Sequence, residues 1–459
     1  MFTDTERSRS DHIVSFESIV SKVLDIKEIN RLAFPAIVYN TVEPIIGLAD
    51  TAIIGQLPEK ATEAQGGVGM AVLLMSLLVW GLAQTRTAVS SMVGRYFGMN
   101  KLDEIKPLIP QMLIFAVLLG VFFWILTDVF YTPIINFIYG VSDPSRLAFS
   151  QDYFHVRSMS LPLILLVQGV FGIFRGYQNT MWAMIISLTG GVLNIVLDLT
   201  LVNGVGDLIP AYGVVGAAWA SVISVALMAI MCVWFLLKKT PFNLNLSFVP
   251  NKELKKTLLI AFNMLIRTLA LNIAFLLAMR FSNGYGKVTH AAYVIGGNIW
   301  LFCSFFIDGY SNAGSAIAGK LLGTQDKGQL RWLGWKLMRI NLIITTGLGL
   351  VFLVLYPFVG PLFSKDVAVQ EEFFSFFWIV LVALPINCIA FSFDGIFKGL
   401  GEAEYLRNTL LIGTFLIFVP VIYTFDYYGF EIFSVWIAFV AWMMFRAGSL
   451  VWKFKRIVA

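Results

Sequence analysis

Long runs of hydrophobic residues alternate with short polar segments along this chain from residue 32 onward. A helix that crosses a bilayer needs about 20 mostly apolar residues. Twelve such segments occur, at residues 32–57, 66–92, 108–132, 153–174, 181–202, 212–237, 257–282, 289–318, 334–358, 372–397, 406–425 and 431–452. The pattern therefore predicts an all-α membrane protein with twelve transmembrane helices, numbered here as spans 1 to 12.

Two short glycine motifs each occur twice, about half a chain apart. Gly94-Arg95-Tyr96-Phe97-Gly98 recurs as Gly319-Lys320-Leu321-Leu322-Gly323, and Gly172-Ile173-Phe174-Arg175-Gly176 recurs as Gly395-Ile396-Phe397-Lys398-Gly399. We interpret these glycines as packing positions, because small residues let membrane helices approach closely. Each repeat holds six spans, so both halves cross the membrane in the same sense. The sequence predicts two six-helix lobes related by a pseudo-two-fold axis along the membrane normal.

The placement of Lys and Arg predicts how the chain is oriented. They gather after the even-numbered spans, at Arg95, Lys101, Lys106, Lys238, Lys239, Lys252, Lys255, Lys256, Lys320, Lys327, Arg331, Lys336, Arg339, Lys453, Lys455 and Arg456. The other loops are assigned only Lys60, Arg146, Arg157, Lys287 and Lys365. Because basic loops stay in the cytoplasm, both termini are expected there.

The polar segments divide the chain. Residues 1–31 are expected to form a cytoplasmic segment with a short amphipathic helix at 12–29 and no cleavable signal peptide. The N-lobe is expected at 32–237 and the C-lobe at 257–452. A cytoplasmic linker is expected at 238–256 and a cytoplasmic tail at 453–459.

Composition supports the membrane class and excludes others. The 459 residues are 58% hydrophobic and 13% charged, whereas soluble domains carry about 25% charged residues. The net charge of +5 contains no basic run typical of a nucleic-acid partner. Cys232, Cys303 and Cys388 lack metal-ligand spacing. No catalytic or nucleotide-binding motif is found, so the chain is not expected to be an enzyme, and no cofactor is expected beyond a coupling ion.

Acidic residues inside span 1 break the apolar pattern. An Asp near the centre of a span costs about 2.5–3.5 kcal/mol on insertion scales, so such residues are functional candidates. Asn40, Glu43, Gly47 and Asp50 follow a spacing of 3, 4 and 3, which places them on one helix face. Pro44 removes a backbone hydrogen bond and is a candidate hinge beside these acids.

Span 5 carries the second polar pair, Asn194 and Asp198, again on one helix face. With Asp50 they form a candidate cation site. Two carboxyl groups close together suit a proton, and carboxylate and amide oxygens suit Na⁺. The sequence does not choose between H⁺ and Na⁺. The counterparts in the second half are about Ala278, Leu416 and Pro420, so the site is expected in the first lobe alone.

The second half has charges of its own. Asp308 in span 8 and Asp394 in span 10 are candidate partners for Arg267 in span 7, because a buried arginine needs a counter-ion. Ion pairing and a substrate or second-ion role both stay open for this possible C-lobe polar site.

Three motifs carry a family resemblance. They are Leu48-Ala49-Asp50-Thr51-Ala52-Ile53-Ile54-Gly55, Asn194-Ile195-Val196-Leu197-Asp198 and Gly213-Val214-Val215-Gly216-Ala217-Ala218-Trp219-Ala220-Ser221. With twelve spans in a six-span repeat, the chain resembles the multidrug and toxic-compound extrusion (MATE) family, most closely its DinF-like bacterial branch. The resemblance implies an antiporter that exports organic compounds using an H⁺ or Na⁺ gradient. It also implies a first-lobe site at Asp50, Asn194 and Asp198, with Ser221 as a further member.

The main hypothesis is therefore a secondary antiporter of the bacterial inner membrane that exports organic, cationic and aromatic compounds as a monomer. Its expected partners are these small molecules and membrane lipid. The alternative is a flippase for lipid-linked oligosaccharide, which would need a cationic cavity for a pyrophosphate. Arg267 and Arg280 are the features that favour it.

Overall fold

The computed structural model describes residues 24–57, 60–139, 143–247 and 249–459, apart from the side chains of Glu43, Leu48, Thr51 and Tyr139. These residues are almost entirely helical, and the only bridge among them joins Val205 and Ile209 in a loop. Eleven of the described helices are long and apolar enough to cross a membrane. A bent pair, with 50° between its halves, makes the twelfth span. The predicted all-helical membrane fold is confirmed.

The N-lobe contains the first six spans. They are α2 (Ile26–Ile54), α3 (Ala61–Leu82) with α4 (Thr85–Gly98), α5 (Leu108–Val129), α7 (Pro144–Ser158) with α8 (Leu161–Gly176), α9 (Met181–Asn203) and α10 (Gly213–Lys239). Two short elements, η1 (Leu102–Ile105) and α6 (Tyr131–Tyr139), lie on either side of α5.

The C-lobe contains the other six. They are α11 (Leu254–Gly284), α12 (Lys287–Thr324), α13 (Lys327–Val354), α15 (Val367–Leu400), α16 (Ala403–Ile412) continued through η2 (Gly413–Phe418) into α17 (Val419–Tyr427), and α18 (Ile432–Val458). The short α14 (Tyr356–Phe363) begins 225 residues after its counterpart α6. This short helix after the third span of each half is a second sign of the repeat.

Several ends differ from the predicted segments because polar residues continue the helices past the apolar windows. Helix α2 begins at Ile26, within the segment expected to precede the first span. Helix α18 runs to Val458, so most of the expected tail is helical. The predicted amphipathic helix at 12–29 lies mainly outside the described residues.

Local signals set the helix starts. Asp143 caps α7, with its Oδ1 accepting from Ser145 N at 2.9 Å, and Pro144 occupies the first turn. Asp326 caps α13 in the same way. An aspartate that accepts from free N–H groups of the first turn stabilises a helix by about 1 kcal/mol, and proline fits there because that N–H has no helical partner.

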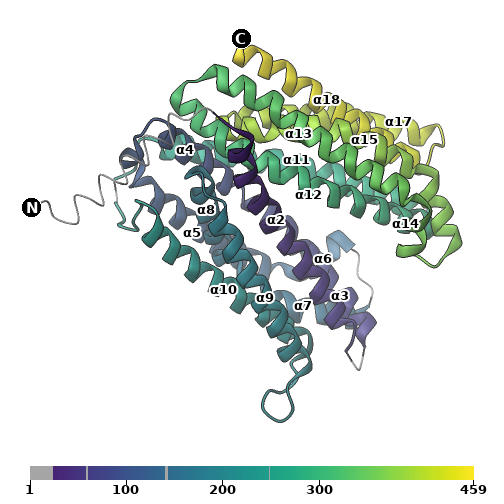
Figure 1. Ribbon diagram of the computed structural model, residues 1–459. Coiled ribbons are helices and arrows are strands. Elements are labelled where there is room, and N and C mark those ends of the chain that lie inside the picture. The colour runs from purple at the N-terminus through teal and green to yellow at the C-terminus, as the bar shows by residue number, and fades with distance from the viewer. Residues whose placement is uncertain (1–23, 58–59, 140–142, 248) are drawn as a thin grey trace, which may run out of the picture.

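The lobes meet at one end of the molecule and diverge toward the other (Figure 1). Helix α12 packs against α2 and α4 of the N-lobe. We call the end where α2 begins and α18 ends the terminal end. There Ile29, Leu32 and Ala88 of the N-lobe join a hydrophobic core built mainly from the C-lobe. The remaining cores lie inside single lobes, so the terminal end is the main connection between them.

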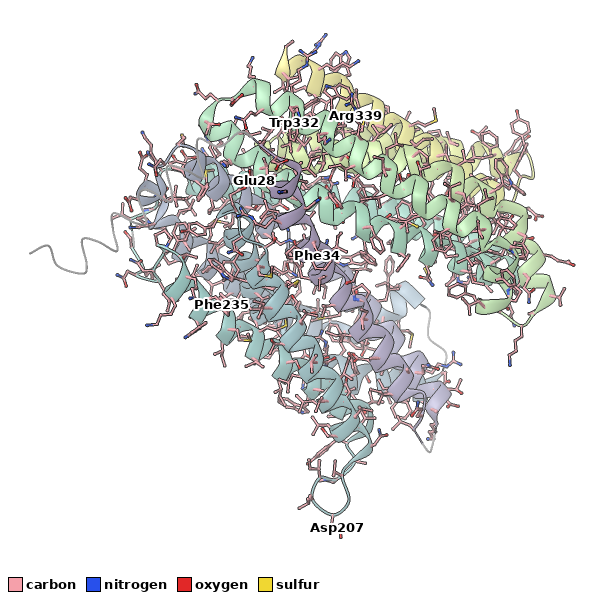
Figure 2. The ribbon with its side chains drawn as sticks, viewed as in Figure 1. Glu28, Phe34, Asp207, Phe235, Trp332 and Arg339 are labelled. Carbon is pink, nitrogen blue, oxygen red and sulfur yellow. The ribbon has the colours of Figure 1, made fainter. Side chains whose placement is uncertain are left out.

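Polar contacts also mark this end. Glu28 Oε1 lies 3.5 Å from Lys320 Nζ of α12, at the junction of the lobes, whereas Asp207 lies at the tip of a loop at the opposite end (Figure 2). Gln178 donates across the lobes to the carbonyl of Ala316 at 2.7 Å. Exposed apolar side chains such as Phe34 cover the sides of the helices, as expected for a surface that faces lipid.

The interlobe linker is bound to the N-lobe. Gln111 of α5 donates to the carbonyls of Ser247 and Val249 at 2.9 and 2.8 Å. Lys252 pairs with Glu104 at 2.5 Å. The hydrogen bond to this carboxylate raises the pKa of Lys252, which therefore stays charged.

Candidate functional site

Four predicted site residues come together inside the N-lobe. Asp50 of α2, Asn194 and Asp198 of α9, and Ser221 of α10 are each at most 3% exposed. Asp50 lies four residues before the end of α2, and Asp198 lies five before the end of α9. At 1.5 Å per residue, both lie about 6–8 Å from those ends. The cluster is therefore in the half of the lobe away from the terminal end.

Small residues on α9 allow this convergence. A side chain at Gly191 would meet Val42 of α2 at 2.9 Å, and one at Gly190 would collide with Met228 of α10. The absence of Cβ atoms lets both neighbouring helices lie close to α9. Asn194 lies about one turn after these glycines and Asp198 about two turns after them. Both side chains therefore lie in the narrow space between the packed helices.

The carboxyl groups of Asp50 and Asp198 lie within hydrogen-bonding reach of each other. Asn194 Nδ2 approaches Ser221 Oγ at 3.4 Å. With its amide turned, Asn194 donates to Asp198 Oδ2 at 3.2 Å and accepts from Ser221 N at 3.3 Å. The turned orientation satisfies both ends of the amide, so we prefer it. Asn194 then holds Asp198 against α10.

Helix α7 supplies two members that the sequence analysis missed. Tyr153 lies beside Asp50 and Arg157, and Arg157 lies near both acids. Arg157 Nη1 also donates to Ser160 Oγ at 2.6 Å. The sequence analysis counted Arg157 among the loop cations, which is wrong, because residue 157 lies inside the predicted fourth span at 153–174 and within helix α7 of the structure. The missed signal was the four-residue spacing of Tyr153 and Arg157, which puts both on one face.

The cluster has the groups needed to bind a small cation. Its oxygens come from two carboxyl groups, an amide, a serine and a tyrosine. Asp50 Oδ1 and Asp198 Oδ1 are buried without a hydrogen-bond partner. A proton shared between the acids, or a Na⁺ ion among these oxygens, would satisfy both atoms. No group of three or more His, Cys, Asp and Glu side chains suited to a metal occurs in the described part of the chain.

The other residues predicted on the same helix face as Asp50 lie further along α2 from this cluster. Asn40 is half-buried and ten residues from Asp50, about 15 Å along the helix. The side chain of Glu43 lies outside the described residues. Pro44 lies inside α2, which continues through it as one helix. Because Pro44 has no N–H, it leaves the Asn40 carbonyl without its helical donor, and a local weakness in α2 follows.

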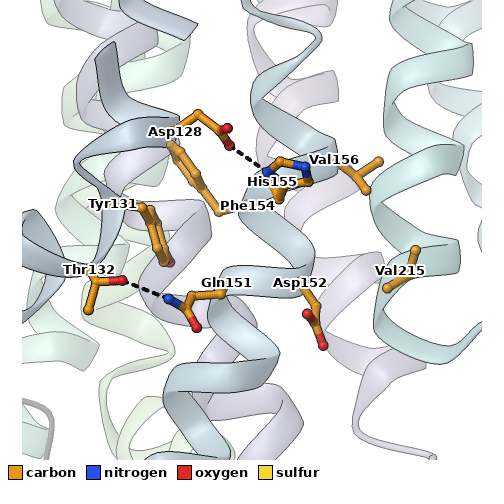
Figure 3. A pocket seen from close by; sticks show the side chains of 9 residues that line it. All are labelled: Asp128, Tyr131, Thr132, Gln151, Asp152, Phe154, His155, Val156 and Val215. Carbon is orange, nitrogen blue, oxygen red and sulfur yellow. Dashed lines mark hydrogen bonds and ion pairs between the residues drawn. The ribbon is translucent and has the colours of Figure 1, made fainter. Parts of the chain in front are cut away.

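The opposite face of α7 lines a cavity of about 400 Å³ (Figure 3). Asp152 and His155 border it, and His155 Nδ1 lies 2.8 Å from Asp128 Oδ1 at the end of α5. Gln151 donates to the Thr132 hydroxyl at 2.6 Å. One helix thus separates the buried acid pair from a polar recess on the side of the lobe.

The C-lobe brings Arg267 and Asp394 together, while Asp308 forms no ion pair with either among the described residues. Arg267 Nη2 lies 2.6 Å from Asp394 Oδ1. Two further cations that the sequence analysis did not assign to this site complete the group. Lys398 Nζ lies 2.7 Å from Asp394 Oδ2, and Arg446 Nη2 lies 3.7 Å from Oδ1. Arg280, by contrast, is exposed.

A two-lobed bundle of twelve spans, with buried polar clusters in each lobe, defines a membrane transporter. The MatE family model matches residues 35–200 and 263–424, one match in each lobe. The chain belongs to the MatE family. It is an integral membrane protein and a drug efflux transporter that handles small molecules, not an enzyme.

Three proteins illustrate what this chain is similar to. Protein DETOXIFICATION 42 of Arabidopsis thaliana is 25% identical over 93% of this chain and 91% of its own. The probable multidrug resistance protein NorM of Thermotoga maritima is 24% identical over 92% and 90%. The solved structure of a MOP superfamily transporter from Pyrococcus furiosus has a TM-score of 0.85 at 22% identity, over 94% and 95%. The similarity to this solved structure shows the fold alone.

Proposed function

We propose that this protein is a secondary active antiporter that exports organic compounds in exchange for H⁺ or Na⁺. The observation that carries the proposal is the buried contact between Asp50 and Asp198, with unpartnered oxygens on both acids. An acid pair inside an apolar lobe is costly unless it binds a cation. The pair has no equivalent at the matching C-lobe positions, so ion coupling belongs to the N-lobe.

Ion binding is proposed to change the shape of α2. A cation that binds Asp50 and Asp198 draws α2 toward α9, with Asn194 and Ser221 holding Asp198 in place. The weak point at Pro44 lies six residues from Asp50 and lets α2 bend without breaking its other hydrogen bonds. Since α2 also packs on α12, such a bend alters the contact between the lobes. The lobes then expose a central path alternately to each side.

The proposed location is the bacterial inner membrane, with the terminal end in the cytoplasm. The loops at this end carry most of the Lys and Arg residues, which favours retention there. The acid pair then lies nearer the outside, where H⁺ or Na⁺ is abundant. Two complete lobes in one chain support action as a monomer embedded in lipid.

The proposed substrates are organic cations with aromatic rings, as the sequence predicted. The acidic N-lobe supports this proposal. Aromatic residues support it less, because some of the tryptophans inside the spans, such as Trp300, are buried in the C-lobe core.

Dye efflux from proteoliposomes tests this function. Purified protein is reconstituted with a fluorescent cationic dye inside, and either a pH gradient or a Na⁺ gradient is imposed. Efflux that depends on one gradient supports antiport and identifies the ion. Efflux at the same rate without either gradient contradicts the proposal.

A flippase for lipid-linked oligosaccharide is the second candidate, and one observation favours it. Arg267, Lys398 and Arg446 surround a single aspartate in the C-lobe, a charge excess that suits a phosphate group. The Pyrococcus furiosus transporter is itself described as having a binding pocket of reverse polarity. Flipping of a fluorescent pyrophosphate lipid in vesicles, without dye efflux, would select this candidate.

A further inference from the structure

The C-lobe interior contains more buried positive than negative charge. Arg267 and Arg446 are 5% and 1% exposed, and Asp394 between them is fully buried. Lys398, whose side chain is 17% exposed, is the third cation. One carboxylate therefore faces three cations. A buried charge without compensation costs several kcal/mol, so this group is incomplete as it stands.

Arg446 is the cation left without a good partner. Arg267 Nη2 lies 2.6 Å from Asp394 Oδ1, and Lys398 Nζ lies 2.7 Å from Oδ2, which is paired by charge but accepts no hydrogen bond. Arg446 Nη2 lies 3.7 Å from Asp394 Oδ1, and Arg446 Nη1 donates to the sulfur of Met443, which is a weak acceptor. Its Nε and Nη2 are buried without a hydrogen-bond partner, as is Arg267 Nε. Buried guanidinium groups normally have acceptors.

The surroundings hold Arg446 in place and add no acceptor. Its guanidinium carbon lies 4.8 Å from the ring of Trp442 and 5.6 Å from that of Phe391. The indole N–H of Trp442 is also buried without a partner. Asp308 is near enough to influence Lys398 and Arg446, but it forms no ion pair with them in the described structure. Several unmatched donors thus accompany the charge excess.

We propose that Arg267, Lys398 and Arg446 form a binding site for an oxyanion, a carboxylate or a phosphate group, with Asp394 as its internal counter-ion. An oxyanion has the acceptors that Arg446 and Arg267 lack, and guanidinium groups match its geometry. Lys398 is the most exposed member and marks the side of entry. Asp394 separates the three cations. Its carboxylate competes with the oxyanion for them, so it keeps the affinity of the site for an oxyanion moderate. The site is separate from the acid pair in the N-lobe and does not depend on the coupling proposal.

Binding is tested on the full-length protein in nanodiscs by thermal unfolding. Inorganic phosphate and succinate are titrated as probes, with chloride at constant ionic strength as the reference. We expect a saturable rise of the unfolding midpoint with the oxyanions beyond that with chloride. Arg446→Gln should abolish this rise, and Arg280→Gln, which removes an exposed charge of α11, should retain it. An absent rise in the wild type, or an equal rise in both variants, overturns the proposal.

A second variant distinguishes loss of oxyanion binding from misfolding. Asp394→Asn removes the competing carboxylate, so the oxyanion should bind about tenfold more tightly or better. A purely structural cluster predicts the opposite, a less stable protein with no response to oxyanions, and that result overturns the proposal. If Arg446→Gln fails to fold, Lys398→Gln takes its place, with the same expected loss of the rise.

Transport measurements identify the source of the anion. Uptake of radiolabelled succinate into proteoliposomes shows that the oxyanion belongs to the cargo. A saturable rise of the midpoint without uptake shows a free anion that completes the C-lobe, and both results uphold the site. Dye efflux is recorded on the same preparation, so failure of antiport is seen separately from failure of oxyanion binding.

Discussion

Gly94 of α4 lies directly against Gly319 of α12, its own counterpart in the second repeat. A Cβ atom at Gly94 would stand 3.3 Å from the Cα of Gly319. One turn further, side chains at Gly98 and Gly323 would collide with the backbones of Lys320 and Arg95 across the lobe interface. The repeated glycine motif is thus one of the contacts that hold the lobes together at the terminal end.

A side chain at Gly323 should therefore open this contact. In Gly323→Ala the added methyl group meets the Arg95 carbonyl, and overpacking of this kind costs about 1–3 kcal/mol. Spin labels at the exposed Asn100 and Gln325 should report a longer distance between α4 and α12. Gly297→Ala is the control, because Gly297 lies on the same helix with open space around it. An unchanged distance in Gly323→Ala contradicts the assigned role.

The acid pair should be essential for export but not for insertion. Asp50→Asn and Asp198→Asn each remove one of the two carboxylates proposed to bind the coupling ion. Gradient-driven dye efflux should fall to the level of empty vesicles, while the amount of protein in the membrane stays the same. Asp207→Asn, in an exposed loop at the same end, is the matched control. Normal efflux by both site variants would show that the coupling site lies elsewhere.

Tyr153 should strengthen ion binding through its hydroxyl group alone. Tyr153→Phe keeps the ring but removes the hydroxyl beside Asp50, and a hydrogen bond from that hydroxyl to a charged carboxylate would contribute about 1.5–3 kcal/mol to the ion-bound state. The gradient needed for half-maximal efflux should rise roughly tenfold. Tyr212→Phe removes an exposed hydroxyl of the same lobe and should have no effect. Equal behaviour of the two variants would remove Tyr153 from the site.

Asn194 distinguishes the two coupling ions. As a Na⁺ ligand its amide oxygen is required, so Asn194→Ala should abolish efflux driven by a Na⁺ gradient. For a proton it only positions Asp198, and efflux driven by a pH gradient should be reduced rather than lost. Asn203→Ala, at the exposed end of α9, is the control. Unaltered efflux in Asn194→Ala under either gradient would exclude the residue from coupling.

The sequence predicted the spans and the N-lobe acids for a common physical reason. Long apolar runs and isolated intramembrane acids are local signals, and Asp50, Asn194 and Asp198 stand out against their neighbours. Tyr153 and Arg157 were not found, because α7 begins in a polar stretch and its inward face is set by the 50° bend before α8.

The C-lobe cluster was predicted only in part. Its members come from α11, α15 and α18, which are far apart in the chain, and Lys398 sits inside a glycine motif that indicated packing. Arg446 lies inside the twelfth predicted span, and the sequence analysis gave it no role. Only the packing of three helices shows that it is buried beside Asp394, with the weakly accepting Met443 sulfur as its hydrogen-bond partner.

The most direct test of antiport uses a dye gradient as the driving force and measures the movement of the ion. An outward dye gradient is imposed on proteoliposomes at equal pH and equal Na⁺ on both sides, and ion entry is followed with a trapped pH indicator or with radioactive Na⁺. The account predicts that dye leaving drives H⁺ or Na⁺ inward, and that Asp198→Asn abolishes this flux. Dye efflux with no ion movement, or the same ion flux in Asp198→Asn, would contradict it.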